Sequence, residues 1–366
     1  METTEWNDES EALLRLACVQ GIGPVKQREI LEALGTACAA WRATTDEVAA
    51  RVEPAVARCL KRGCDERAVD RALRWREATG HHVVAWNSSR YPPLLREIAD
   101  PPLVLYAKGD TARLAGPSLA IVGSRNATAQ GRRDAFDFAA ALSHAGLCIV
   151  SGMALGIDGC AHEGGLAGPG SSIAVLGTDI DTIYPQAHRK LAERLEREGC
   201  IVSDFELGTP ALKGNFPARN RLISGLARGV LVVEAALESG SLITAKCGLE
   251  QNRDVFAMPG SIHSPLSKGA HALIRSGAKI TECVDDILVE LRMLEHTRMQ
   301  EPERSRADPL LDAMGFAPIS LEQLASLSGM GVDKIAAGLS RLELEGRVAP
   351  LTGGLFQRTS RASPPR

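Results

Sequence analysis

The 366-residue sequence is poor in aromatic residues, at 4%, and its apolar runs, such as 230–233, are short. A bilayer span needs roughly 20 apolar residues, so no membrane partner is expected. The nine cysteines are scattered without a Cys-x-x-Cys pair, which argues against a zinc site and a disulfide framework. Residues 1–10 are acidic and polar, unlike a signal peptide, so we expect a cytoplasmic protein.

Two further absences narrow the function. No Gly-Lys-Ser/Thr tripeptide occurs, which removes the case for a Walker A loop and ATP hydrolysis. The net charge of −3 excludes a generally basic nucleic-acid coat. It leaves a local basic site open, because binding depends on local charge.

Short β-branched runs recur between residues 118 and 294, and helical spacing fills the segments between them. Ala135, Phe138, Ala139 and Leu142, for example, lie on one helical face. Near-continuous apolar strands that alternate with helices are typical of a parallel sheet covered on both faces. We therefore predict an α/β fold with a Rossmann-like, doubly wound, mostly parallel sheet. The predicted strands are 119–122, 147–150, 173–176, 200–202, 230–233 and 255–258.

Smaller units flank this sheet. The first 80 residues are helical in pattern, and Gly21-Ile22-Gly23-Pro24 resembles the turn of a helix-hairpin-helix that offers N–H groups to a phosphate. An ordinary tight turn in a helical bundle is the simpler interpretation. A proline-rich connector follows, flanked by the apolar segments 83–85 and 103–106. The predicted domains are a helical domain (1–80), an extended Rossmann-like domain (81–294), a linker (295–308), a winged helix (309–358) and a tail (359–366).

The winged-helix prediction depends on a short pattern. Ser320 with Gln323 predicts a capping box, a second helix follows at 332–344, and 347–358 predicts a hairpin around Gly353-Gly354. The second helix carries acidic residues beside Lys334 and Arg341, which makes it a poor electrostatic match for DNA. Protein contact is therefore at least as good an interpretation as weak DNA binding.

Loops rich in glycine and serine follow three of the predicted strands. Ligands of open α/β sheets bind outside the carboxyl ends of the strands, where glycine permits close approach and helix N-termini favour anions. Three such loops at one edge predict an extended phosphate-binding surface. Its predicted members are Gly123, Ser124, Arg125, Ser151, Gly152, Gly240 and Ser241.

The segment 207–233 contains no acidic residue and four basic ones. An aromatic side chain among cations is typical of single-strand recognition, in which a ring stacks on a base and positive charge follows the backbone. The alternative is a solvated basic loop with Phe216 packed in the core. We predict a DNA-binding loop that contains Lys213, Phe216, Arg219, Asn220 and Arg221.

Catalytic chemistry has weaker support. Asp158 and His162 lie four residues apart on a predicted helix and could form an acid–base or metal pair. We favour the simpler interpretation, in which Asp158 caps the helix and His162 hydrogen-bonds within the fold. No catalytic residue, metal site or cofactor is predicted.

Five motifs in order resemble the DNA processing protein A family (DprA, also called Smf): Ile121-Val122-Gly123-Ser124-Arg125, the segment 150–158, Phe216-Pro217-Ala218-Arg219-Asn220-Arg221, the segment 238–245 and Met258-Pro259-Gly260. The resemblance implies a sterile-alpha-motif-like front domain and, in some members, a winged-helix tail. It also implies a non-enzymatic protein that binds single-stranded DNA in natural transformation and helps to load a RecA-type recombinase. Members act as homodimers through the Rossmann-like domain.

Two other functions stay open. The Gly-rich loops resemble those of lysine-decarboxylase-like phosphoribohydrolases, so the chain could bind or cleave a mononucleotide with Glu234 or Glu238 as the acid–base group. The Pro-Gly-Gly-x-Gly-Thr signature expected of that group is missing, however. The third possibility is an adaptor whose sheet only supports protein contacts.

Overall fold

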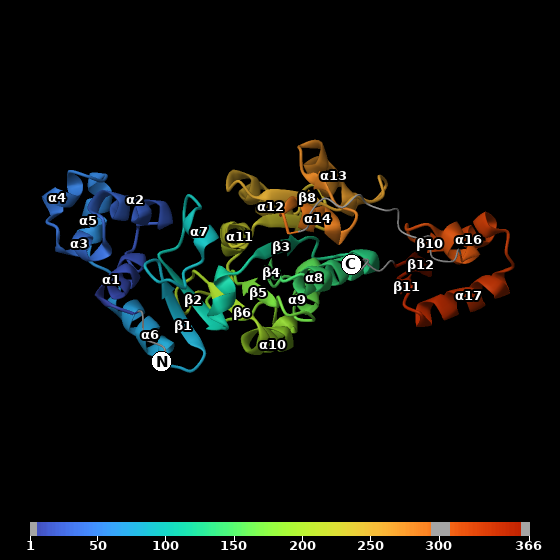
Figure 1. The fold of residues 1–366 in the computed structure, drawn as a ribbon, viewed down its shortest axis with the longest axis horizontal. Helices are drawn as coiled ribbons and strands as arrows, with labels where there is room; N and C mark the ends of the chain where they lie inside the picture. The colour runs from blue at the N-terminus through green and yellow to red at the C-terminus, as the bar shows by residue number, and fades with distance from the viewer. Residues whose placement is uncertain (1–5, 294–307, 360–366) are drawn as a thin grey trace.

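A computed structural model describes residues 6–293 and 308–359, and a nine-stranded sheet forms its centre (Figure 1). The strand order is β1-β2-β6-β5-β4-β3-β7-β8-β9. The strands from β6 to β9 are parallel, whereas β1 and β2 extend the sheet in antiparallel pairing beyond β6. The predicted α/β class with a mostly parallel sheet is confirmed. The strands are β1 (His81–Ala85), β2 (Val104–Gly109), β3 (Ser118–Val122), β4 (Cys148–Ser151), β5 (Ser172–Val175), β6 (Cys200–Ser203), β7 (Gly229–Val232), β8 (Asp254–Ala257) and β9 (Lys279–Ile280).

Helices cover both faces of the parallel strands, which explains why those strands are apolar throughout. In β3, Leu119 and Ile121 pack on one face, whereas Ala120 and Val122 pack on the other. The first face is covered by α8 (Ala129–His144), α9 (Ile157–Gly165) and α14 (Val284–Glu290). The second is covered by α7 (Pro93–Arg96), α11 (Asn215–Gly225), α12 (Gly240–Glu250) and α13 (Lys268–Arg275). The two-residue strand β9 was not predicted, because Lys279–Ile280 is too short to give a strand pattern.

The helices before the sheet share one continuous core with its β1–β2 end and with α10 (Arg189–Glu198). The Trp75 ring stacks on His81 at 4.2 Å between centroids. Its Nε1 donates to Asp181 across 3.0 Å. The helical region is thus attached directly to the sheet. Its helices are α1 (Asp8–Ala17), α2 (Pro24–Leu34), α3 (Ala37–Arg42), α4 (Thr45–Ala49), α5 (Pro54–Arg62) and α6 (Glu66–Arg76).

The C-terminal unit is a winged helix, as predicted, and lies at the opposite end of the molecule from α1–α6 (Figure 1). The capping box of Ser320 and Gln323 is present, and the hairpin turns at Gly353 and Gly354, both with positive φ. The structure adds a short helix and a third strand to the prediction. Its elements are α15 (Pro309–Met314), β10 (Ile319–Ser320), α16 (Leu321–Ser328), α17 (Val332–Leu344), β11 (Val348–Leu351) and β12 (Leu355–Arg358). The predicted linker at 295–308 lies almost wholly outside the described residues, as do most of the tail and residues 1–5.

The sheet has a topological switch point beside β3. From β3 the chain passes to β4, β5 and β6 on one side, and it later returns to β7 and β8 on the other. Connections that diverge in this way leave a crevice at the carboxyl ends of the strands, where open α/β sheets bind their ligands.

Candidate nucleic-acid interface

Three loops meet at this switch point, after β3, β4 and β7. The Ser124 N–H donates to the carbonyl oxygen of Glu234 at 2.7 Å. The Ile157 N–H, at the start of α9, donates to the carbonyl oxygen of Ser124 at 3.2 Å. These bonds join the loops into one surface, so the residues that the sequence assigned to a common edge do lie together.

The glycines in the first two loops are required by the packing of the protein itself. A Cβ at Gly123 would lie 2.6 Å from Cγ1 of Ile157. A Cβ at Gly152 would lie 2.8 Å from Nη2 of Arg219 and 2.9 Å from Oδ2 of Asp158. Gly240 differs, because a Cβ there would meet no atom within 4 Å. Of these three glycines, Gly240 alone therefore leaves its backbone open to a close approach from outside.

The hydroxyl groups of the first two loops point inward. Ser124 is buried, and its Oγ accepts from the Asn126 N–H at 3.1 Å. Ser151 is also buried, and its Oγ donates to the carbonyl oxygen of Ile121 at 2.6 Å. Arg125, in contrast, is exposed, and its side chain has no hydrogen bond or ion pair within the described residues. It is the cation that this part of the edge offers to a ligand.

The predicted basic loop at 213–221 is a helix over most of its length. Helix α11 begins at Asn215 and includes Pro217 in its first turn, where the missing proline N–H has no partner to lose. The helical periodicity turns Arg219 and Asn220 into the protein, whereas Lys213 stays exposed and unpaired within the described residues. The prediction of a loop over 213–221 is therefore wrong from Asn215 onwards, where the segment is helical.

Arg219 lies beneath the interface, with only 5% of its surface exposed. Its guanidinium donates to the carbonyl oxygens of Gly152, at 2.8 Å, and of Val175. The Asp158 carboxylate accepts from the N–H groups of Gly152 and Ala154 at 3.1 and 3.3 Å. Burial lowers the pKa of Arg219 to about 10 and raises the pKa of Asp158. The two side chains hold the loop after β4 from below.

Asn220 and Arg221 also serve the fold. The Asn220 Nδ2 donates to the carbonyl oxygen of Gly240 at 3.3 Å, which fixes the first turn of α12. Arg221 forms ion pairs with Asp204, at 2.5 Å, and with Asp100, at 3.2 Å, and so ties α11 to the connector. At the start of α12, the Ser239 hydroxyl accepts a hydrogen bond from the N–H of Ser241. Ser241 is buried, whereas Gly240 is exposed.

Phe216 is half-buried. A Cβ at Gly177 would lie 2.8 Å from Cδ1 of Phe216, so the ring rests directly on the backbone of the loop after β5. Its other neighbour is Tyr184, from the same loop, at 5.3 Å between ring centroids. Sequence reasoning missed Tyr184 because it followed the loops after three other strands. The same rule applied to the strand 173–176 would have reached it.

Of the four groups considered for acid–base or metal chemistry, Asp158, His162 and Glu234 are engaged in structural bonds, whereas Glu238 is exposed just before α12. Glu234 accepts from the Thr128 N–H at 2.9 Å and from its hydroxyl at 2.6 Å, at the start of α8. His162 accepts from the Met153 N–H through Nε2, so its Nδ1 donates to Ser172 Oγ at 2.7 Å. Burial, together with His188 and Arg219, lowers the His162 pKa to about 3 and keeps the ring neutral. The favoured interpretation of His162 is confirmed, whereas Asp158 binds the preceding loop instead of capping α9.

Within the described ranges, no group of three or more His, Cys, Asp or Glu side chains is placed to hold a metal ion. In the same part of the chain, every helix is too short or too polar to cross a bilayer.

Cations in the two other regions considered for phosphate binding form ion pairs with carboxylates. Beside the Gly21–Pro24 turn, Lys26 pairs with Glu29 at 2.9 Å and Arg28 with Glu32 at 2.7 Å. In the winged helix, Arg341 pairs with Asp308 at 2.6 Å. These pairs weaken the phosphate-binding interpretation of both units.

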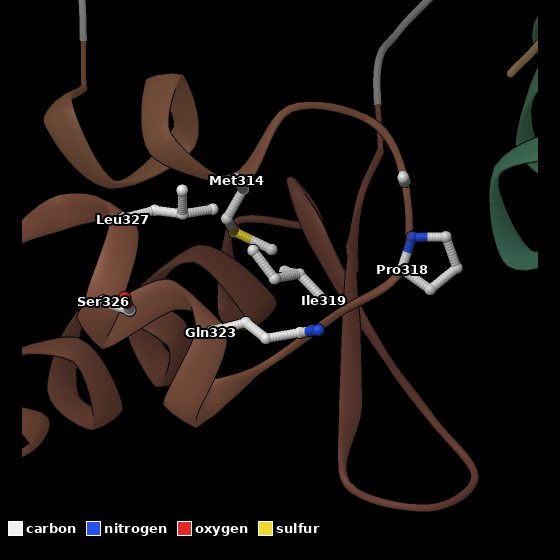
Figure 2. A pocket seen from close by; sticks show the side chains of 7 residues that line it. Met314, Pro318, Ile319, Gln323, Ser326 and Leu327 are labelled. Atoms are coloured by element: carbon white, nitrogen blue, oxygen red, sulfur yellow. The ribbon is translucent and has the colours of Figure 1, made fainter.

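The winged helix instead carries an apolar groove of about 490 Å³ (Figure 2). Met314, Ile319 and Leu327 line it, and Gln323 is the largest polar side chain at its wall. No lining residue is charged, so the groove has no group that would hold a phosphate.

The fold and the joined loops define a class: an open α/β protein with a row of Gly- and Ser-rich loops at a topological switch point, which is where such folds bind ligands. A family model described as DNA recombination-mediator protein A matches residues 82–292, and one described as DprA winged helix domain matches residues 295–354. The chain belongs to this DprA/Smf family, as its motifs predicted.

Individual relatives agree with this assignment. Protein Smf of Escherichia coli (strain K12) is 42% identical over 300 residues, which cover 79% of this chain and 80% of the relative. A solved structure of DNA processing protein A from Streptococcus pneumoniae has a TM-score of 0.66 at 35% identity and covers 75% of this chain and 95% of that one. The structure of DNA processing protein A from Helicobacter pylori, which was solved to study its single-stranded DNA binding mode, has a TM-score of 0.53 at 30% identity. It covers 58% of this chain and 96% of that one.

Proposed function

We propose that this protein binds single-stranded DNA along the carboxyl edge of its sheet. The observation that carries the proposal is the pair of exposed, unpaired cations, Lys213 and Arg125, with the half-buried Phe216 ring at the same edge. Cations contact phosphates without regard to sequence, and an aromatic ring stacks on any base. The single-stranded DNA binding of the Helicobacter pylori relative supports the same ligand here.

The spacing of the two cations favours a polymer over a mononucleotide. Lys213 follows β6 and Arg125 follows β3, and these strands lie three positions apart in the sheet. At about 4.8 Å between neighbouring strands, the ends of these two strands are about 14 Å apart. A strand can place different phosphates on the two loops, whereas a mononucleotide carries its phosphate at one position only.

The wider role follows from the family. We propose that the chain acts as a non-enzymatic mediator of recombination in the cytoplasm, that it protects incoming DNA in natural transformation, and that it helps to load a RecA-type recombinase. We also propose a homodimer through the Rossmann-like domain, which would join two interfaces into a longer track. Light scattering of the purified protein tests the dimer, and a strand-exchange assay with a RecA-type recombinase tests the loading.

The DNA interface is tested by replacing its two cations. Arg125→Ala and Lys213→Ala should each weaken binding to a labelled single strand, and each should reduce the salt slope by about one unit. Arg67→Ala is the matched control, because Arg67 is an exposed cation on α6, in the helical region. If both interface variants keep the wild-type affinity and salt slope, the proposal is wrong.

A further inference from the structure

Tyr184 is an exposed aromatic side chain in a protein that has few. Half of its surface is open to solvent, whereas the other two tyrosines, Tyr91 and Tyr106, are buried. Its hydroxyl has no hydrogen-bond partner within the described residues. An exposed tyrosine offers a large apolar ring face and a polar tip that stays in water, which makes it suited to contact with a ligand.

The loop that carries Tyr184 is rigidly held beside the loop that carries Lys213. Asp179 is 5% exposed and accepts from the Thr182 N–H at 2.8 Å in its own loop. Its second oxygen accepts from the Gly208 N–H at 2.6 Å in the loop after β6. One buried carboxylate thus fixes the relative position of both loops, so Tyr184 and Lys213 are presented together.

The geometry of the two rings defines what they can bind. The Tyr184 and Phe216 centroids are 5.3 Å apart, and the ring planes are inclined at 44°. A base inserted between two rings would need about 6.8 Å, twice the stacking distance of about 3.4 Å. No base therefore fits between them, and each ring can offer only its own outer surface.

We propose that Tyr184 is a second stacking position, which takes the nucleobase next to the one on Phe216. The inference rests on the proposed single-stranded DNA function and extends its track towards the loop after β5. Beyond Tyr184, the exposed side chain of Lys190 at the start of α10 continues the path with positive charge, whereas Arg189 beside it pairs with Glu193 at 3.8 Å.

A substitution series tests the stacking directly. Tyr184→Leu should weaken binding to a single-stranded oligonucleotide at least about fivefold, since stacking contributes about 1–3 kcal/mol per base. It should leave binding to an abasic strand of equal charge nearly unchanged. Tyr184→Phe should bind like the wild type, and Phe136→Leu on α8 is the control for loss of an exposed ring. Equal losses on the base-bearing and abasic strands would overturn the proposal.

A double-variant cycle separates a base contact from mere support of Phe216. If Tyr184 takes its own base, Tyr184→Leu weakens binding further in a Phe216→Leu background. If it only positions Phe216, the second substitution has no additional effect, and the proposal is wrong. Photocrosslinking of a 5-iododeoxyuridine strand to the full chain, followed by peptide mapping, should give an adduct at Tyr184.

The failure of this inference differs from failure of the proposed function. If Lys213→Ala weakens binding and the Tyr184 variants do not, the proposed DNA interface is supported and the proposed second stacking position is wrong. If the wild-type protein binds no single strand, the proposed function itself is wrong.

Discussion

The guanidinium of Arg219 donates a hydrogen bond to the carbonyl oxygen of Gly152 across 2.8 Å, from beneath the loop that follows β4. In the sequence, Arg219 stands among cations beside an aromatic residue and resembles a ligand for DNA. In the fold it supports the surface that the exposed cations share. Basic residues in this segment thus divide into those that offer charge and those that hold the loops in place.

Replacement of Arg219 by Met should destabilise the protein. It should not remove a direct contact with DNA, because Arg219 is buried beneath the interface. The substitution removes the buried hydrogen bonds of the guanidinium to the carbonyl oxygens of Gly152 and Val175, and it removes a positive charge that favours the ionised form of the buried Asp158. Losing two charge-assisted buried hydrogen bonds should lower the free energy of unfolding by about 3–5 kcal/mol. Urea denaturation followed by circular dichroism measures the change. Wild-type stability combined with a selective loss of DNA binding would show instead that Arg219 reaches the ligand.

Two glycines should respond oppositely to the same added methyl group. Gly240→Ala meets no atom within 4 Å, so it should fold normally and weaken DNA binding about three- to tenfold by blocking the approach to the α12 backbone. Gly152→Ala should lower the stability by about 1–3 kcal/mol through overpacking against Arg219. Denaturation and anisotropy on both variants check this, and unchanged binding by Gly240→Ala would remove α12 from the interface.

His162 should make the protein sensitive to acid. Its folded-state pKa of about 3 lies below the unfolded value, so only the unfolded chain takes up a proton as the pH falls below about 6.5. Its contribution is therefore present above that pH and is lost progressively towards pH 3. Between pH 6.5 and 5 the loss is about 2 kcal/mol.

The His162 prediction is checked by the slope of unfolding free energy against pH. His162→Gln should flatten this slope, whereas His263→Gln should not, because His263 is exposed. An identical slope in the wild type and His162→Gln would contradict the account.

Glu234→Gln should act on stability and not on catalysis. The amide cannot accept both Thr128 bonds as the carboxylate does. The start of α8 is therefore held less well, and the free energy of unfolding should fall by about 1–2 kcal/mol. A nucleoside monophosphate incubated with either protein should release no free base. Release by the wild type that Glu234→Gln abolishes would instead favour the nucleotide-cleaving alternative.

The fold was accessible from the sequence because burial on both faces makes parallel strands apolar, and six such runs stood between helical segments. Strand β9 was missed, since two residues carry no periodicity. Loop positions at the carboxyl edge were also predictable, because strand ends in a parallel sheet share one edge.

The direction in which side chains point was harder to predict from the sequence. Whether Arg219 faces solvent depends on where α11 begins, and the segment was predicted to be a loop although Pro217 fits the first turn of a helix. The Ser124 N–H donates to the carbonyl oxygen of Glu234, which lies 110 residues further along the chain. The Ser151 hydroxyl donates to the carbonyl oxygen of Ile121 in β3, 30 residues earlier. Such contacts have no local signal.

The central claim is tested most directly by fluorescence anisotropy of a labelled mixed-sequence single strand, titrated with the protein at low and moderate salt. Duplex of the same sequence and a mononucleotide serve as competitors. We predict tight, salt-sensitive binding that the mononucleotide does not displace, with much weaker binding of the duplex. Weak binding to the strand with efficient displacement by the mononucleotide would contradict it and would identify the loops as a small-ligand site.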